Sequence, residues 1–238
     1  MHKAAVMTPP TDSTAASPRL IDLSHTITEG LLTYPGLPAP HIFEHLDRQA
    51  AQQIYGADVT FTIGMITMCS NTGTYLDVPF HRFADGHDLS ELALHRVANV
   101  PAVCIDCRGI DAIGPDVLDG LELAGHAVLF RTDHSRHFAT PAYLQAHPRL
   151  AAATAEALVA AGVACVGIDS LNIDAIDGPD GAGRPVHTTL LGHDIPIIEH
   201  LTALEELPEG GFRFTAVPPK IEGFGTFTVR AFAALSPD

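Results

Sequence analysis

The pattern of hydrophobic and polar positions along the 238 residues predicts a sheet-rich chain with few helices. Nearly unbroken β-branched and apolar runs, typical of strands buried on both faces, lie at 59–68, 101–108, 126–132, 163–168 and 195–198. Shorter runs predict strands at 19–26, 212–217 and 227–235. The alanine-rich segment 151–161 predicts a helix, and Gly162 after it suits a left-handed cap.

The order of these elements indicates an α/β fold. A strand, a helix and a strand follow one another from residue 126 to residue 168, which predicts a parallel pair joined by a crossover. Since no repeat or linker divides the chain, we expect one domain at 19–238. Residues 1–18 have too few large apolar side chains to repay ordering and predict a flexible tail. A loop rich in glycine, aspartate and proline is predicted at 177–185.

Charge and composition exclude several classes of partner. The formal net charge of −15 argues against binding to nucleic acid or to an anionic membrane. No apolar run reaches the roughly 18 to 20 residues of a membrane span, and the first residues lack the apolar core of a signal peptide. We therefore expect a cytoplasmic protein that acts on a small molecule.

The four cysteines, Cys69, Cys104, Cys107 and Cys165, lie in apolar, strand-like runs that favour reduced, buried thiols. Cys104 and Cys107 form a C-x-x-C, which also occurs in redox pairs and zinc sites. On a strand, however, residues three apart point to opposite faces, so this pair is poorly placed to share one ligand.

A polar, turn-rich segment follows the first long apolar run and contains Asp77 and His81. In an extended loop, residues four apart can point to the same side. An acid and an imidazole placed in this way can bind a metal or relay a proton. The alternative is a structural one, because an aspartate in a glycine-rich turn often bonds its own backbone.

His187 and Glu199 form a second pair of candidates, more than a hundred residues later. Histidine and carboxylate are the usual ligands of zinc or manganese, and a carboxylate can also act as a base toward metal-bound water. Glu199 ends an apolar run, where an unpaired charge is costly to bury. That position favours a functional role for Glu199.

Residues 71–81 carry most of a longer motif. The pattern His-x-Gly-Thr-His-x-Asp-x-Pro-x-His is matched here at Gly73, Thr74, Asp77, Pro79 and His81. Further matches in the same order are Ile21–His25, Tyr34–Gly36, Phe130–Thr132, Val166–Asp169, His187 with Leu190 and Leu191, Ile197–Glu199, and Val229–Ala231. Over these residues, which span nearly the whole chain, the sequence resembles the cyclase family of metal-dependent hydrolases, which includes bacterial kynurenine formamidases and isatin hydrolases.

The resemblance implies a single-domain, swivelling β/β/α fold with a mixed central sheet, and a homo-oligomer, either a dimer or a tetramer. It also implies a site with one or two divalent ions. Carried over to this sequence, the metal ligands are Asp77, His187 and Glu199, and His81 is the general acid or base. Glu199 is expected to take part in catalysis as well.

Two positions depart from the family pattern, because Asn71 and Tyr75 replace its first two histidines. An amide oxygen is a poor zinc ligand, and a phenol with an ordinary pKa of about 10 coordinates a metal only once it is ionised. We therefore expect one divalent ion, zinc or manganese, held by Asp77, His187 and Glu199. Asn71, Thr74 and Tyr75 are expected to line the substrate pocket.

Three functions remain open at this point. The leading one is a formamidase-like hydrolase that opens an amide, lactone or related C–N or C–O bond of a small cyclic or aromatic metabolite. The second is a metal-free cyclase, isomerase or lyase of a biosynthetic pathway that uses the same acid–base residues. The third is a non-catalytic protein that binds a small molecule.

Overall fold

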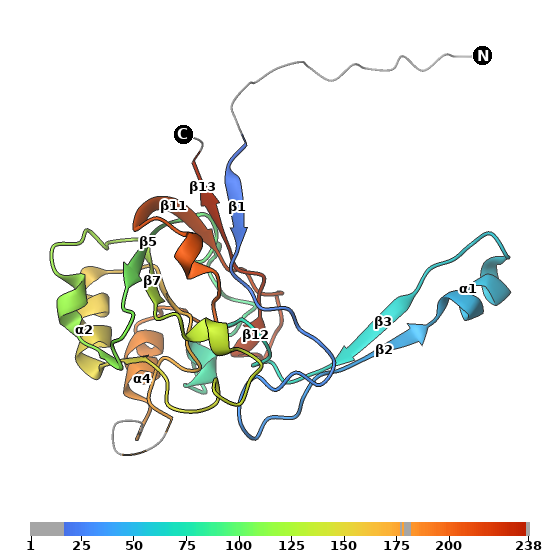
Figure 1. Cartoon of the computed structure of the whole chain (residues 1–238), viewed down its shortest axis with the longest axis horizontal. Coiled ribbons are helices and arrows are strands. Elements are labelled where there is room, and N and C mark those ends of the chain that lie inside the picture. The colour runs from blue at the N-terminus through green and yellow to red at the C-terminus, as the bar shows by residue number, and fades with distance from the viewer. Residues whose placement is uncertain (1–16, 177, 179–181, 237–238) are drawn as a thin grey trace, which may run out of the picture.

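The computed structural model of the chain describes residues 17–176, 178 and 182–236 (Figure 1). Most of the predicted tail and part of the predicted loop at 177–185 lie outside these residues. Within the described ranges, no helix is long and apolar enough to cross a membrane.

A nine-stranded mixed sheet forms the body of the molecule, in the order β1-β13-β11-β5-β7-β9-β10-β4-β12. Its strands are β1 (Arg19–Asp22), β4 (Tyr75–Asp77), β5 (Val100–Asp106), β7 (Ala127–Arg131), β9 (Cys165–Ile168), β10 (Ile197–Glu199), β11 (Gly210–Thr215), β12 (Thr226–Thr228) and β13 (Phe232–Leu235). The four central strands β5, β7, β9 and β10 are parallel, and the flanking pairs are antiparallel. The predicted α/β class and mixed central sheet are confirmed.

Helices α2 (Ala152–Ala161) and α4 (Pro185–Gly192) pack against each other and share one apolar core with the sheet. A second core lies on the opposite face of the sheet. Gly162 ends α2 with a φ of 69°, as predicted. The short elements of the body are β6 (Ala112–Ile113), β8 (Arg149–Leu150), η1 (Pro79–His81), η2 (Leu94–Arg96), η3 (Pro115–Leu118), η4 (His134–His137) and η5 (Leu204–Glu206).

The structure also tests the predicted C-terminal strand and the predicted state of the cysteines. Residues 227–235 contain most of β12 and the whole of β13, and do not form one strand. All four cysteines are free. Cys104 belongs to one core and Cys107 to the other, so the two thiols lie on opposite sides, as the strand periodicity indicates.

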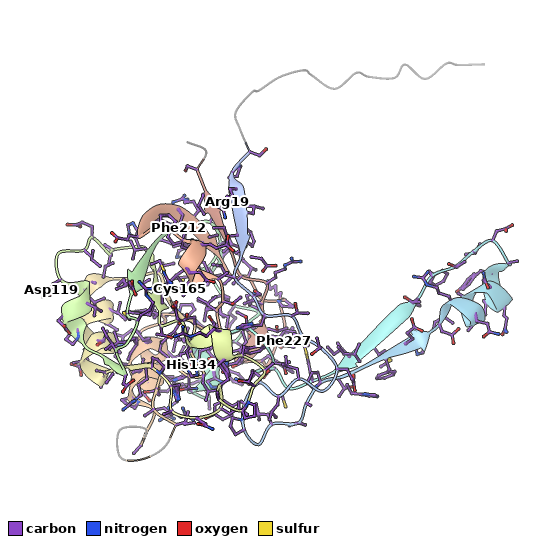
Figure 2. All side chains as sticks on the ribbon, in the orientation of Figure 1. Arg19, Asp119, His134, Cys165, Phe212 and Phe227 are labelled. Carbon is purple, nitrogen blue, oxygen red and sulfur yellow. The ribbon has the colours of Figure 1, made fainter. Side chains whose placement is uncertain are left out.

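The prediction of a buried strand at 59–68 is wrong. Residues 41–67 form an arm that extends away from the body, built from β2 (His41–Leu46), α1 (Arg48–Tyr55) and β3 (Ile63–Thr67) (Figure 1). β3 pairs with β2 alone, and every residue of β3 is exposed. Figure 2 shows the side chains of the arm standing clear of the body. The apolar run therefore reflects a surface that no other part of the described chain covers.

Candidate active site

The register of three antiparallel strands brings the first site residues together. β4 lies between β10 and β12, so that Tyr75 is opposite Glu199 and Asp77 is opposite Thr226. Directly opposed residues, and residues two apart on one strand, point to the same face of a sheet. These four side chains therefore share one face.

A tight turn after β4 returns His81 to the same place. Pro79 begins the 3-10 helix η1, and the chain passes Gly225 so closely that a Cβ there would lie 2.2 Å from the backbone nitrogen of His81. Only glycine permits this approach. The imidazole Nδ1 of His81 then lies 2.7 Å from the hydroxyl of Thr226.

Thr226 also hydrogen-bonds Asp77, and this contact fixes the tautomer of His81. An ionised carboxylate only accepts hydrogen bonds, so the Thr226 hydroxyl donates to Asp77 and accepts from the Nδ1–H of His81. The Nε2 of a neutral His81 is left with a free lone pair. That atom can bind a cation or accept a proton.

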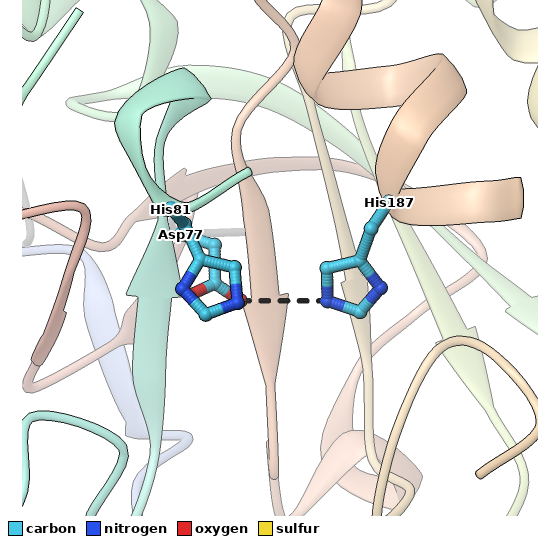
Figure 3. Close-up of side chains that lie close together, drawn as sticks. All are labelled: Asp77, His81 and His187. Atoms are coloured by element: carbon cyan, nitrogen blue, oxygen red, sulfur yellow. Dashed lines mark ion pairs between the residues drawn. The ribbon is translucent and has the colours of Figure 1, made fainter. Parts of the chain in front are cut away.

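His187 comes from the first turn of α4, and Asp174 fixes its orientation. The carboxylate of Asp174 accepts the backbone N–H groups of Val186 and His187 and lies 2.7 Å from the Nδ1 of the same histidine. A carboxylate that holds Nδ1 in this way fixes the ring so that Nε2 can serve as a metal ligand. Here Nε2 faces Asp77 Oδ2 at 3.7 Å (Figure 3). Glu199 Oε1 lies 3.8 Å from the same Nε2.

Asp77, His81 and His187 form a group that fits a metal ion. One ligand atom from each lies within 4.8 Å of the others. Asp77 is fully buried, and its Oδ2 has no hydrogen-bond partner among the described residues. Because an unpartnered buried carboxylate oxygen is costly, a cation at this point would relieve the cost. Two imidazoles and a carboxylate are ligands that zinc and manganese accept.

Glu199 lies beside this group, but both of its oxygens have protein partners. Oε1 accepts the backbone N–H of Ile173, and Oε2 accepts the hydroxyl of Tyr75, each at 2.6 Å. Burial raises the pKa of Tyr75 well above its ordinary value, so this side chain is a neutral donor. Tyr75 therefore donates a hydrogen bond to Glu199 and does not take over the role of a metal-binding histidine.

The charges of the site are strongly coupled. Burial lowers the pKa of His187, but its hydrogen bond to Asp174 and the negative charges of Asp77 and Glu199 beside it outweigh burial and raise the pKa to about 10. Burial and the charge of Asp77 raise the pKa of Glu199 to about 7, although His187 opposes them. The carboxylates thus require a positive charge among them, carried by a proton on His187 or by a metal ion.

His187 and Glu199 face a cavity of about 270 Å³. Its walls are Tyr34, Leu37, Asn71, Tyr75, His81, Arg82, Asn172, Arg184, His187 and Glu199. Asn71 and Tyr75 are thus among the lining residues, and their predicted contact with a substrate stays a prediction. Thr74 is not among the lining residues, because its hydroxyl donates to the backbone carbonyl of His200 and accepts the N–H of His25.

Sequence reasoning missed four residues that shape the site: Asn172, Asp174, Arg184 and Thr226. Asn172 and Asp174 follow the predicted strand at 163–168, and polar residues just beyond a buried strand are a recognisable signal. Thr226 carries no such signal, because its role depends on the register of β12 against β4.

Comparison with known proteins agrees with the resemblance seen in the sequence. A family model described as "Putative cyclase" matches residues 21–175. A kynurenine formamidase of Bacillus cytotoxicus is 31% identical over 199 residues, which cover 83% of this chain and 88% of that protein. A kynurenine formamidase of Bacillus cereus is 28% identical over 213 residues, covering 89% of this chain and 95% of the relative.

Solved structures show the same architecture. Isatin hydrolase A from Ralstonia solanacearum superposes with a TM-score of 0.78 at 26% identity, covering 91% of this chain and 92% of that one. A structure described as a potential metal-dependent hydrolase with cyclase activity gives 0.73 at 26% identity, covering 92% and 98%. These matches confirm the predicted fold and the prediction of an enzyme related to these hydrolases.

Proposed function

The chain belongs to the putative cyclase family, and from this premise we propose that it is a metal-dependent, formamidase-like hydrolase. Its substrate is a small cyclic or aromatic metabolite, in which it opens an amide, lactone or related C–N or C–O bond. Relatives named kynurenine formamidase and isatin hydrolase support this reaction class. The observation that carries the metal dependence is the buried Oδ2 of Asp77, which has no hydrogen-bond partner among the described residues and faces Nε2 of His187.

Asp77 and His187 are proposed to hold one zinc or manganese ion, with Glu199 as the third ligand, because Oε1 of Glu199 keeps a second lone pair beside the bond that it accepts from Ile173. The Nε2 of His81, the other imidazole of the group, is then left for proton transfer. Such an ion, when bound, lowers the pKa of water and polarises a carbonyl. Asp174 orients His187 through Nδ1. Asn71 and Tyr75 form the cavity wall that two histidines provide in the family pattern, and there they contact the substrate.

His81 is proposed to transfer the proton to the leaving group. Its side chain is 36% exposed, whereas those of Asp77 and His187 are 1% and 6% exposed. Of the three, only His81 can exchange protons readily with water, which suits a general acid or base. Thr226 holds the ring so that Nε2 is the atom that receives and delivers the proton.

A metal-free cyclase, isomerase or lyase is the second candidate, and the bond between Tyr75 and Glu199 favours it. A buried carboxyl with a pKa of about 7 can take and return a proton near neutral pH. In that case Glu199 and His81 carry the acid–base chemistry, and Tyr75 donates a hydrogen bond.

Turnover of a panel of aryl formamides, aryl amides and lactones, before and after treatment with a chelator, separates these functions. The hydrolase proposal expects turnover that the chelator abolishes and that zinc or manganese restores. Turnover that survives the chelator, in protein without bound metal, supports the metal-free candidate. Binding of panel members without turnover supports the third alternative, a non-catalytic binding protein.

We also propose that the protein is a homo-oligomer in which a second copy covers the arm. Eight of the fourteen exposed large hydrophobic side chains of the described chain lie on the arm: Ile42, Phe43, Ile54, Tyr55, Val59, Ile63, Met65 and Ile66. Such a concentration of apolar surface is costly in water. Light scattering should give the mass of a dimer or a tetramer, and Ile66→Asp should shift it toward the monomer.

A cytoplasmic location remains a proposal. The four free thiols support it, because reducing compartments keep cysteines unpaired. Fractionation of cells that produce the protein tests it directly.

A further inference from the structure

The cavity carries positive charge in a chain that has little of it. The sequence contains 13 lysine and arginine residues against 28 aspartate and glutamate residues. Nevertheless, two of the ten lining residues are arginines, Arg82 and Arg184. The proposed hydrolysis of a neutral bond uses neither of them, so their presence calls for a separate explanation.

Arg184 occupies a position that ordinary preferences disfavour twice. It is the residue before α4 and has left-handed backbone angles, φ 49° and ψ 65°, which glycine or asparagine adopts at least cost. A cation is also unfavourable at a helix N-terminus, where the backbone dipoles place partial positive charge. Because Asp174 already accepts the first backbone N–H groups of α4, Arg184 is not needed as a cap.

Neutral groups hold the guanidinium in place. Nη1 donates to Asn172 Oδ1 at 2.8 Å, and Nη2 donates to the hydroxyl of Tyr34 at 3.1 Å. No carboxylate of the described residues forms an ion pair with Arg184. A guanidinium has more N–H donors than these two bonds use, so part of its donor edge remains for a ligand in the cavity.

The contacts of Arg184 also fix its place relative to the proposed reaction centre. Asn172, which accepts from Arg184, donates through Nδ2 to Glu199 Oε2 at 3.5 Å. A chain of two hydrogen bonds thus joins the guanidinium to Glu199. Arg82 differs, because it is exposed, donates to Thr188 and lies over the ring of Phe83.

We propose that Arg184 is a specificity-determining residue that binds a carboxylate of the substrate, and that the enzyme therefore prefers aromatic amides carrying such a group near the bond that is cleaved. A guanidinium offers a planar pair of donors that matches a carboxylate, and a lysine cannot reproduce this geometry. Tyr34 and Leu37 supply an aromatic and an apolar wall beside the same subsite. This inference rests on the proposed hydrolysis.

The test compares 2-formamidobenzoate with its neutral analogue 2-formamidobenzamide in the wild type, Arg184→Gln and Arg82→Gln. Arg184→Gln should lower kcat/KM for the benzoate about 10- to 100-fold, the usual loss for a hydrogen bond to a charged group. The same variant should change kcat/KM for the benzamide by less than about threefold, and Arg82→Gln should change the ratio of the two substrates little. Thermal unfolding of each variant checks that it is folded.

Calorimetric binding of benzoate and benzamide tests the subsite independently of turnover. The subsite is supported if the wild type and Arg82→Gln bind benzoate more tightly than benzamide and Arg184→Gln does not. This result would support the subsite even if neither formamide is hydrolysed, and only the proposed hydrolysis would then fail. If Arg184→Gln weakens the binding of benzoate and benzamide equally, the carboxylate subsite is overturned and the proposed hydrolase function is unaffected. A preference for the anion that depends on Arg82 and not on Arg184 also overturns it.

Discussion

The arm and the site strands depart from the usual separation of apolar interior and polar surface in opposite directions. β3 leaves Ile63, Met65 and Ile66 each 46% exposed, whereas β4 and β10 bury Asp77 and Glu199 completely. Both regions nevertheless follow from similar sequence patterns, an apolar run followed by polar residues. Local composition alone therefore does not decide which run enters the core.

The exposed apolar side chains of the arm and the buried carboxylates of the site are both unfavourable on their own, and each is stabilised by a different kind of partner. Exposed apolar side chains on a projecting arm are stabilised when another surface covers them, which fits the proposed second copy. Buried carboxylates around one imidazole are stabilised when a cation joins them, which fits the proposed metal ion. Violations of the ordinary pattern are expected where a protein binds something.

The largest expected effect compares Ile198 of β10 with Ile66 of β3. Ile198 is fully buried, so Ile198→Ala should lower the free energy of unfolding by about 2–5 kcal/mol. Ile66→Ala should change the free energy of unfolding of the monomer by no more than about 0.5 kcal/mol. Urea denaturation at low protein concentration measures both. Equal losses would mean that the arm is covered by its own chain.

The next effect concerns His25, whose backbone N–H donates to the hydroxyl of Thr74, the residue before β4. Its ring stacks on Phe138 with centroids 3.6 Å apart, its Nε2 is buried without a hydrogen-bond partner among the described residues, and burial lowers its pKa to about 4. The unfolded chain, with a pKa of about 6.5, takes up this proton first as the pH falls. Stability should therefore decrease between pH 6.5 and pH 4, by at most about 3 kcal/mol from this residue.

The variant His25→Phe keeps the stacking on Phe138 and removes the titrating group. Chemical denaturation at several pH values should then show a shallower loss of stability below pH 6.5 than the wild type shows. The exposed histidine variant His87→Phe is the control, and its pH dependence should match the wild type. An unchanged slope in His25→Phe would contradict the buried, neutral state of His25.

A smaller effect is expected from Asp174, which acts on the site through His187. Asp174→Asn keeps an oxygen for the ring Nδ1–H but removes the charge, so metal affinity and kcat/KM should fall about 10- to 100-fold. Metal titration measures the affinity. Asp88→Asn is a matched control, because Asp88 is a half-buried acid that accepts hydrogen bonds from Ser90 and Gly223, and the loss of its charge should not change metal affinity.

Much of the fold could be predicted because the central strands are covered within this chain. Ile197 and Ile198 point into two different cores, so an unbroken apolar run is the correct sign of a strand buried on both faces. The same pattern at 59–68 led to the wrong prediction of a buried strand, since the two strands of the arm pair only with each other. The sequence pattern reports that a surface will be covered, and it does not report by which molecule.

The site could be predicted in part for a similar reason. Asp77, His187 and Glu199 were found through a motif and through the cost of burying a charge, and the structure brings Asp77 and Glu199 each within 4 Å of His187. The role of Thr226 depends on strand register, and that of Arg184 on a left-handed residue before a helix. Neither feature is visible before the chain is folded.

Metal analysis of the purified wild type and of Asp77→Asn tests the central claim most directly. The account predicts about one zinc or manganese ion per wild-type chain and a loss of this ion in Asp77→Asn, with the variant still folded because it removes a buried charge. Glu91→Gln, which changes an exposed acid, should retain the metal. A wild-type protein that hydrolyses its substrate at full rate without bound metal, and gains nothing from added divalent ions, would contradict the account.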